Sequence, residues 1–253
     1  MDRGTYAKIM KLTDRFGKID LAQIDQASLM NRMDEKCWLP VRMLPEILEE
    51  ILDFYDILSV EGTCLQDYYT AYYDTPFDEF YLSHHNGKRN RVKVRKRNYL
   101  LSDRCFIEIK RKCNKGRTDK VRREIPSICP WLVREEQDFV HSYVNCDPGD
   151  LDQKMECCFQ RLTLINTTRR ERCTVDLGVC FQNSVHSAGI PGISIMELKQ
   201  EDRRSGSILG SALKRRRIPI RGFSKYCIGR VLLQPELKHN RLKPTLRSLQ
   251  QYT

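Results

Sequence analysis

The sequence predicts an α+β protein in which about eight strands form a barrel with a charged interior and with helices packed outside. At least five strand candidates carry charged residues on one face and aliphatic residues on the other, because side chains two positions apart share a face. Residues 88–123 also hold 16 Lys/Arg against 3 Asp/Glu. Such faces could simply meet solvent, but like charges on one face repel one another. A closed barrel would instead line a water-filled tunnel with them and remove exposed strand edges.

The charge distribution favours an anionic partner. The chain has 253 residues, of which 40% are hydrophobic and 30% are charged, and this suits one large domain with or without appendages. The net charge is +11, and the positive excess lies in two blocks, residues 88–123 and residues 203–253. Blocks of this kind suit a phosphate polymer, a nucleotide, a nucleic acid or a membrane surface.

Several other classes of protein are disfavoured. No segment approaches about 18 consecutive apolar residues, and the first residues show no signal-peptide-like stretch, so we expect no transmembrane helix. The 11 cysteines are odd in number and form no CxxC motif, which is typical of a reduced, cytoplasmic protein. The basic strands lack interleaved aromatic residues, so sequence-specific nucleic-acid recognition is not expected. Phosphate-binding motifs of the GxxxxGK[ST] and GxGxxG types are absent, as is a persuasive nucleophilic triad.

The first third of the chain alternates helices with short strands. Residues 1–31 are predicted to be helical and peripheral, with Asp20 as a helix cap. Residues 32–40 form a strand that ends at a proline, and residues 44–55 follow the spacing of an amphipathic packing helix. Two strands within residues 56–74 are separated by a Glu-Gly turn.

Two short segments connect these strands to the basic block. Thr75 is predicted to cap a short helix, and residues 84–87, His-His-Asn-Gly, are predicted to be a solvated turn. Adjacent histidines on a loop diverge, so this pair does not indicate a metal site.

Strongly basic strands follow at residues 91–97, 106–112 and 120–125. The charged face is formed by Arg91, Lys93, Arg95 and Arg97, by Glu108, Lys110 and Lys112, and by Lys120, Arg122 and Glu124. Lys96 is expected to face outward with Val92 and Val94, so that Lys96→Ala has little effect.

The C-terminal half supplies the remaining strands and two capped helices. Residues 126–155 are predicted to be an inserted cap on the outside, and the tail from Gln234 is predicted to fray or pack loosely. The other expected elements are strands at 158–165, 171–177 and 193–199, a loop at 183–191, and helices capped by Ser205 and Ser224.

A tunnel with this lining suits a chain of phosphates. Arg and Lys neutralise phosphate oxygens, and Arg can bind them bidentately. A few carboxylates could hold Mg²⁺ or Mn²⁺ against the phosphates, because hard cations take oxygen ligands and often use only one or two carboxylates. Phosphoryl transfer depends on positioning and charge neutralisation, so it requires no nucleophilic Ser or Cys. The plainer interpretation of each carboxylate is an ion pair with neighbouring cations.

Several segments follow one another in a specific order. They are Leu29-Met-Asn-Arg-Met-Asp-Glu-Lys36, Tyr72-Tyr-Asp-Thr75, Lys93-Val-Arg-Lys-Arg97, Phe106-Ile-Glu-Ile-Lys-Arg-Lys112, Glu197-Leu-Lys199 and Phe223-Ser-Lys-Tyr-Cys-Ile-Gly229. Over roughly residues 20–230 the chain thus resembles bacterial VTC domains, the polyphosphate polymerase domains of the triphosphate tunnel metalloenzymes. The resemblance implies an antiparallel β-barrel tunnel that binds triphosphate or polyphosphate with a divalent metal, and a C-terminal helix that closes one mouth.

The resemblance also implies roles for individual residues. The expected catalytic residues are Lys36, Arg95, Arg97, Lys110 and Glu197, and Glu197 is the expected metal ligand, with Glu108 and Asp176 as weaker metal candidates. Further expected phosphate-binding residues are Lys93, Lys112, Lys120, Arg122, Arg161, Lys199 and Lys225.

The sequence departs from the family pattern at two places. Phe159 replaces the tyrosine of a Y-x-R pattern that ends at Arg161, and a hydroxyl donor is lost. The ExExK signature of the wider superfamily is replaced by Arg32-Met-Asp-Glu-Lys36, with one carboxylate on the inward face instead of two. This second departure favours polymerase-like members over triphosphatases or adenylyl cyclases.

The expected function is therefore a metal-dependent polyphosphate polymerase that transfers the γ-phosphate of ATP to a growing chain. The tunnel domain is expected at residues 32–233, between a helical segment at 1–31 and a basic tail at 234–253. The expected ligands are ATP, polyphosphate or triphosphate with Mn²⁺ or Mg²⁺, and a separate membrane partner could receive the product. Two alternatives stay open: an inorganic or nucleoside triphosphatase of the same fold, and a non-catalytic polyphosphate-binding module.

Overall fold

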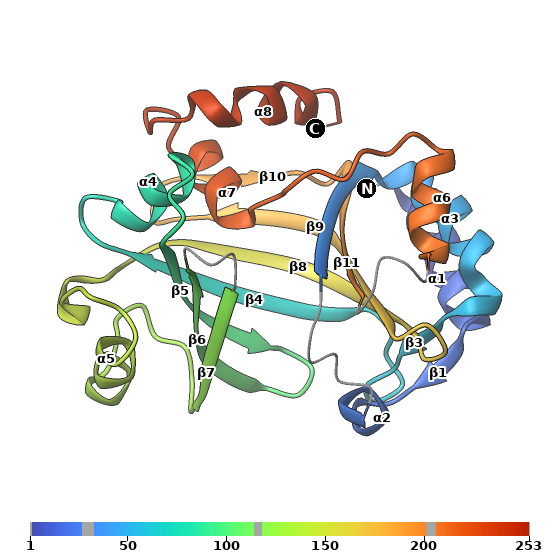
Figure 1. Cartoon of the computed structure of the whole chain (residues 1–253), viewed down its shortest axis with the longest axis horizontal. Helices are drawn as coiled ribbons and strands as arrows, with labels where there is room; N and C mark the ends of the chain where they lie inside the picture. Colours follow the sequence, from blue (N-terminus) through green and yellow to red (C-terminus); the bar gives the residue numbers. More distant parts are fainter. Residues whose placement is uncertain (1, 27–32, 114–117, 201–205, 253) are drawn as a thin grey trace.

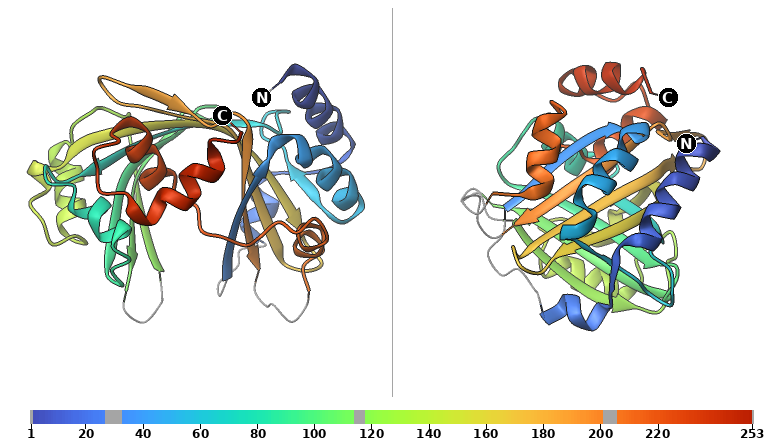
Figure 2. Two further views of the ribbon diagram at one scale, coloured as in Figure 1. Left: turned by 90° about the horizontal axis from the view of Figure 1, so that it is seen from above. Right: turned by 90° about the vertical axis from the view of Figure 1, so that its right-hand side faces the viewer.

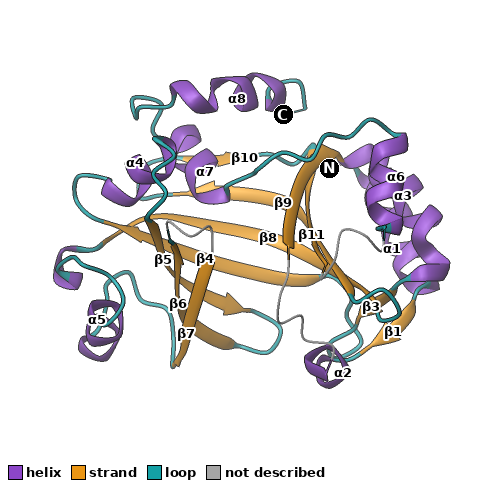
Figure 3. Ribbon diagram, in the orientation of Figure 1, coloured by secondary structure: helices purple, strands orange, loops and turns teal. Residues whose placement is uncertain are grey.

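A computed structural model gives the structure of residues 2–26, 33–113, 118–200 and 206–252 (Figures 1 and 3). The strands are β1 (Gly17–Ile19), β2 (Met33–Pro40), β3 (Asp56–Leu58), β4 (Gln66–Asp74), β5 (Arg91–Tyr99), β6 (Arg104–Lys112), β7 (Thr118–Ile125), β8 (Asp152–Asn166), β9 (Glu171–Gln182), β10 (Ser187–Gly189) and β11 (Ile193–Gln200). The helices are α1 (Arg3–Arg15), α2 (Leu21–Gln26), α3 (Leu44–Ile51), α4 (Glu79–His85), α5 (Arg134–His141), α6 (Ile208–Arg215), α7 (Lys225–Leu233) and α8 (Lys243–Leu249).

The strands form one strongly bent sheet. Its main path is antiparallel, in the order β2-β11-β9-β8-β4-β5-β6-β7. Short strands extend it, with β3 beside β8, β1 parallel to β3, and β10 beside β9. Seen from above, the sheet is a trough in which β2 and β11 face β5, β6 and β7 across the interior (Figure 2, left). The antiparallel α+β architecture expected from the sequence is confirmed.

The trough is not closed by hydrogen bonds between its edges. Strands β2 and β7 end the strand order, and no pairing joins them within the described residues. The closed barrel expected from the sequence is therefore replaced by an open-sided tunnel. The sheet does not bend far enough to bring its end strands, β2 and β7, into a hydrogen-bonded pair.

Helices cover the aliphatic outer faces of the trough. Helices α1, α3 and α6 pack over β2, β11, β9 and β8, where Leu48, Val175 and Leu198 are buried. Helix α3 forms because its apolar positions repeat at helical spacing behind an N-terminal proline. The insert that contains α5 covers β4, β5 and β6, and its Val140 packs in one cluster with Val94. The expected position of this insert on the outside is confirmed.

Helices α7 and α8 close one end of the trough (Figure 1). Ser224 caps α7 as expected, because its hydroxyl accepts a hydrogen bond from the Cys227 N–H at 3.2 Å. Helix α8 belongs to the tail that was expected to fray. Instead, Leu249 is buried, and the Tyr252 ring contacts Trp38 edge to face at 6.3 Å. The tail packs because its apolar side chains, Leu249 and Tyr252 among them, join the buried cluster that contains Trp38.

Among the strand residues, the structure corrects the predicted surroundings of Lys96. It faces outward from β5, as expected, but it is 0% exposed because the α5 insert covers it. Its ammonium pairs with Glu136 Oε2 at 2.7 Å and donates to the Trp131 carbonyl at 2.8 Å. The expectation that Lys96→Ala has little effect assumed an exposed side chain, so the structure overturns its basis.

Some element boundaries also differ from the prediction. His85 ends α4 and is buried, and its Nε2 forms a hydrogen bond with Asn240 Oδ1 at 2.6 Å, so it does not lie in a solvated turn. Strand β8 begins at Asp152, within the segment assigned to the insert, and β10 lies within the predicted loop at 183–191. Strand β1 was not predicted.

Some sequence predictions concern residues outside the described part of the chain. These are Ser205 as a helix cap and residues 29–32 of the first motif. Helix α6 is capped instead by Ser207, whose hydroxyl accepts from the Gly210 N–H at 2.7 Å. Within the described residues, no helix combines the length and apolar character needed to cross a membrane.

Candidate functional site

Charged side chains form rows across the inward face of β5, β6 and β7. Strand register places Lys93, Lys110 and Lys120 side by side in one row. The neighbouring row continues onto β4 and contains, in strand order, Tyr72, Arg95, Glu108 and Arg122. Residues directly opposite each other on one face of a sheet interact. The cations of these two rows, which line one wall of the trough, therefore share one carboxylate, that of Glu108.

Glu108 is the centre of this wall. Its side chain is 1% exposed; it accepts from Arg95 Nε at 2.7 Å and pairs with Arg95 Nη2 at 2.6 Å. Lys120 Nζ contacts the other carboxylate oxygen. Burial would raise the pKa of Glu108, but Arg95, Arg97 and Lys120 together outweigh burial and hold the pKa below its usual range. The carboxylate therefore stays ionised and orients both cations.

Asp176 on β9 also orients two cations, on the adjoining wall of the trough. Arg161 of β8 binds it bidentately, with Nε–Oδ1 and Nη2–Oδ2 distances of 2.5 and 2.8 Å. Lys225 of α7 also contacts Oδ2. Burial would raise the pKa of Asp176, and these two cations instead hold it below its usual range. One carboxylate thus fixes an arginine of the sheet and a lysine of the closing helix.

Glu197 on β11 lies beside Lys36 on β2, with 2.5 Å between Oε1 and Nζ. Burial would raise the pKa of Glu197, and the charges of Lys36 and Lys199 hold it below its usual range. The Glu197 side chain is 17% exposed, compared with 4% for Asp176 and 1% for Glu108. Of these three carboxylates, Glu197 is therefore the most accessible to a ligand.

Helix α7 brings its N-terminal end to the basic wall. Lys93 Nζ donates to Ser224 Oγ at 2.9 Å, so the residue that caps α7 also contacts β5. Burial lowers the pKa of Lys93 to about 8, and the neighbouring cations contribute in the same direction. An anion bound here would favour the charged form of Lys93 and raise its pKa again.

Aromatic rings support the guanidinium groups, and no function for these rings is evident from the sequence. Tyr68 and Phe159 stack with 5.2 Å between ring centroids. The Arg161 guanidinium lies 5.0 and 5.2 Å from these centroids, and Arg97 lies 5.5 and 5.8 Å from them. Lys225 Nζ lies 4.3 Å from the Phe159 ring. Phe159 thus lacks a hydroxyl but contacts three cations. The spacing of Phe159 and Arg161, two apart on one strand, is the feature of the sequence that indicates that their side chains share a face.

The remaining residues that were expected to bind phosphate lie nearer the margins of the inward surface. Arg122 is exposed, with its guanidinium 4.8 Å from the Phe106 centroid. Lys112 pairs in register with Arg91 at one end of β5 and β6, and Lys199 lies on the same face of β11 as Glu197. The structure therefore gathers on the inward faces and at the end of α7 Lys36, Lys93, Arg95, Arg97, Glu108, Lys110, Lys120, Arg161, Asp176, Glu197 and Lys225.

The inward carboxylates differ in their fit to a divalent metal. The described residues contain no group of three His, Cys, Asp or Glu side chains that could hold an ion. Glu108 and Asp176 are each held by two cations, and this arrangement does not suit them as ligands. Glu197 is more accessible, and it suits a hard cation that takes most of its ligands from substrate oxygens and water.

The family model of the VTC domain matches residues 31–234. Because this match includes most of the chain, the protein belongs to the VTC domain family, and the resemblance of its ordered segments is confirmed. No curated protein gave a match.

Solved structures with a similar arrangement share little sequence with this chain. One is a candidate adenylate cyclase from Bacillus halodurans, at 9% identity and a TM-score of 0.48 over 77% of this chain and 94% of that chain. Another is a candidate adenylyl cyclase from Hippeastrum described as having a dominant triphosphatase activity, at 16% identity and a TM-score of 0.48 over 83% of this chain and 100% of that chain.

Proposed function

We propose that the protein is a metal-dependent polyphosphate polymerase that transfers the γ-phosphate of ATP to a growing polyphosphate chain. The observation that supports this most is the convergence of cations from several strands and from α7 on one interior. The inward carboxylates, which are Glu108, Asp176, Glu197 and, by strand register, Asp34, neutralise only part of that charge. A linear polyanion is the ligand that would neutralise the rest. Membership of the VTC domain family favours triphosphate and polyphosphate among such ligands.

The proposed reaction depends on binding and orientation. Arg95 and Arg161 would bind phosphate oxygens from directions that Glu108 and Asp176 fix in advance, which lowers the entropic cost of aligning the reactants. Lys93 and neighbouring lysines would neutralise charge on the transferred phosphoryl group. Mn²⁺ or Mg²⁺ held by Glu197 and by phosphate oxygens would supply further charge neutralisation when bound.

The test is to incubate the purified protein with ATP and Mn²⁺ and to stain the products for polyphosphate after electrophoresis. Glu197→Gln is expected to bind triphosphate but to lose turnover. Glu49→Gln is the matched control, because Glu49 forms an exposed ion pair with Arg15 on the outside at 3.0 Å. This control is expected to form polymer at the wild-type rate.

Two other outcomes would replace the proposal. Release of phosphate from inorganic triphosphate without any polymer would indicate a triphosphatase of the same fold. Binding of polyphosphate without turnover, unchanged or tightened by Glu197→Gln, would indicate a binding module whose affinity falls steeply with salt.

A further inference from the structure

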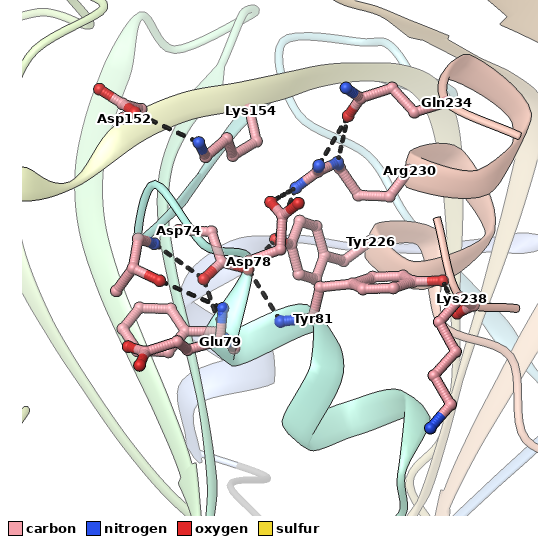
Figure 4. Close-up of polar contacts among 12 residues, drawn as sticks. Asp74, Asp78, Glu79, Tyr81, Asp152, Lys154, Tyr226, Arg230, Gln234 and Lys238 are labelled. Carbon is pink, nitrogen blue, oxygen red and sulfur yellow. Dashed lines mark hydrogen bonds and ion pairs between the residues drawn. The ribbon is translucent and has the colours of Figure 1, made fainter. Parts of the chain in front are cut away.

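Buried polar residues join α4 to α7 next to the proposed phosphate site (Figure 4). They are Asp74 at the end of β4, Asp78 before α4, and Tyr226 and Arg230 on α7. We call this set the α4–α7 clamp. Asp74 is 0% exposed and Arg230 is 1% exposed. Burying charged groups is costly unless they are well paired, and the proposed reaction gives these groups no chemical step.

Asp74 holds the start of α4 and the phenol of Tyr226 at the same time. Its carboxylate accepts from the backbone N–H groups of Thr75, Phe80 and Tyr81, each at 2.8 Å. The Tyr226 hydroxyl donates to Asp74 Oδ2. Burial raises the pKa of Tyr226 well above its ordinary value, so the phenol keeps its proton and remains a donor.

Arg230 lies one helical turn after Tyr226 and makes the second connection to α4. Its Nη1 donates to Asp78 Oδ1 at 2.8 Å and to the Tyr226 hydroxyl at 3.3 Å. Its Nε and Nη2 donate to Gln234 Oε1 at 3.1 and 2.6 Å. Asp78 has a positive φ of 59°, a strained backbone conformation that this pairing accompanies. The clamp therefore fixes α7 both along its axis and in its rotation.

The clamp borders directly on residues of the proposed site. Tyr226 follows Lys225, which contacts Asp176, and its ring stacks on Tyr72 with 5.1 Å between centroids. Tyr72 lies in the same row as Arg95. A rotation of α7 that moves the Tyr226 hydroxyl therefore also moves the Lys225 ammonium.

We propose that the α4–α7 clamp positions Lys225 for binding of the phosphate chain, with Tyr226 and Arg230 as positioning residues. This inference rests on the proposed function, because it assigns the clamp to the same site. The ligand would contact Lys225 and not the clamp. Loss of a clamp bond should therefore act mainly through Lys225, which distinguishes positioning from general stabilisation.

The test is a double-mutant cycle measured by calorimetric titration with inorganic triphosphate. Tyr226→Phe removes the hydroxyl and keeps the ring, and it is expected to weaken binding by about five- to ten-fold. Lys225→Ala is expected to weaken binding by about ten-fold or more. In the Lys225→Ala protein, Tyr226→Phe is expected to change the affinity by less than about two-fold.

Tyr73→Phe is the matched control. Tyr73 precedes Asp74 on β4, and its buried hydroxyl donates to the Cys129 carbonyl at 2.7 Å on the outer face of the sheet. This variant is expected to lose stability but to bind triphosphate within about two-fold of wild type. If Tyr226→Phe does not fold, Asp78→Asn replaces it in the cycle, because it weakens the second connection and leaves Tyr226 intact.

The possible failures are distinguishable. If the wild-type protein does not bind triphosphate, the proposed function fails and the positioning role fails with it. If wild type binds, the positioning role alone is overturned by an unchanged affinity in Tyr226→Phe, or by an equal loss with and without Lys225.

Discussion

Lys96→Met is expected to destabilise the protein without weakening triphosphate binding. The buried Lys96 ammonium pairs with Glu136 at 2.7 Å and donates to the Trp131 carbonyl at 2.8 Å. Methionine keeps the apolar stem but leaves the Glu136 carboxylate buried without its cation. Breaking a buried ion pair in this way costs about 3–5 kcal/mol. At about 2–4 °C per kcal/mol for a protein of this size, the melting temperature should fall by roughly 6–20 °C.

Urea unfolding followed by circular dichroism measures the free energy of unfolding of three variants: Lys96→Met, Glu136→Gln and the double variant. The double variant should be more stable than Lys96→Met alone, because Gln is uncharged and can still accept the Val133 N–H bond of 2.9 Å. Arg95→Gln, on the opposite face of β5, should lose triphosphate affinity by at least about ten-fold. A loss of less than about 1 kcal/mol in Lys96→Met, or equal losses of affinity at both positions, would refute the assigned faces.

Two further predictions concern pH and packing. Burial lowers the pKa of Lys93 to about 8, and a bound anion favours the charged form of this lysine. Raising the pH from about 7 to 9 should therefore weaken triphosphate binding. For the same reason, the protein should take up protons when it binds triphosphate near pH 8. Calorimetry in buffers of different ionisation enthalpy measures this uptake, which should shrink in Lys93→Arg; equal uptake in both proteins would contradict the assignment. Gly229→Ala should lower the melting temperature, because its Cβ would lie 2.5 Å from Phe181 Cδ1 and 2.7 Å from Met155 Cε. Gly222→Ala has no atom within 4 Å of its Cβ and should behave like wild type; similar stabilities of the two variants would refute close packing of α7.

Much of the inward surface could be predicted because it depends on local rules. Alternation along residues 91–97 assigned Arg95 to the inner face and Lys96 to the outer face, since a strand turns successive side chains to opposite sides. The cap of α7 was predictable for the same reason, because Ser224 bonds within its own helix. The motifs that indicated the family also lie on these elements.

Features that depend on distant segments could not be predicted in this way. Alternation gives the face on which Lys96 lies, but not that the α5 insert covers it. The bond between Tyr226 and Asp74 joins residues far apart in the sequence, and neither residue alone indicates the other. The open gap between β2 and β7 depends on how far the whole sheet bends. The tail was misjudged because its composition is polar, although a few apolar residues such as Leu249 are buried.

A crystal structure of the protein with inorganic triphosphate would show directly whether the inward faces of the trough bind the phosphate chain. Phosphate oxygens are expected within about 3.5 Å of nitrogen atoms of Arg95, Arg161 and Lys225. The contrary result would be triphosphate bound to basic residues at the end of α6, such as Lys214 and Arg215, with none between the walls of the trough.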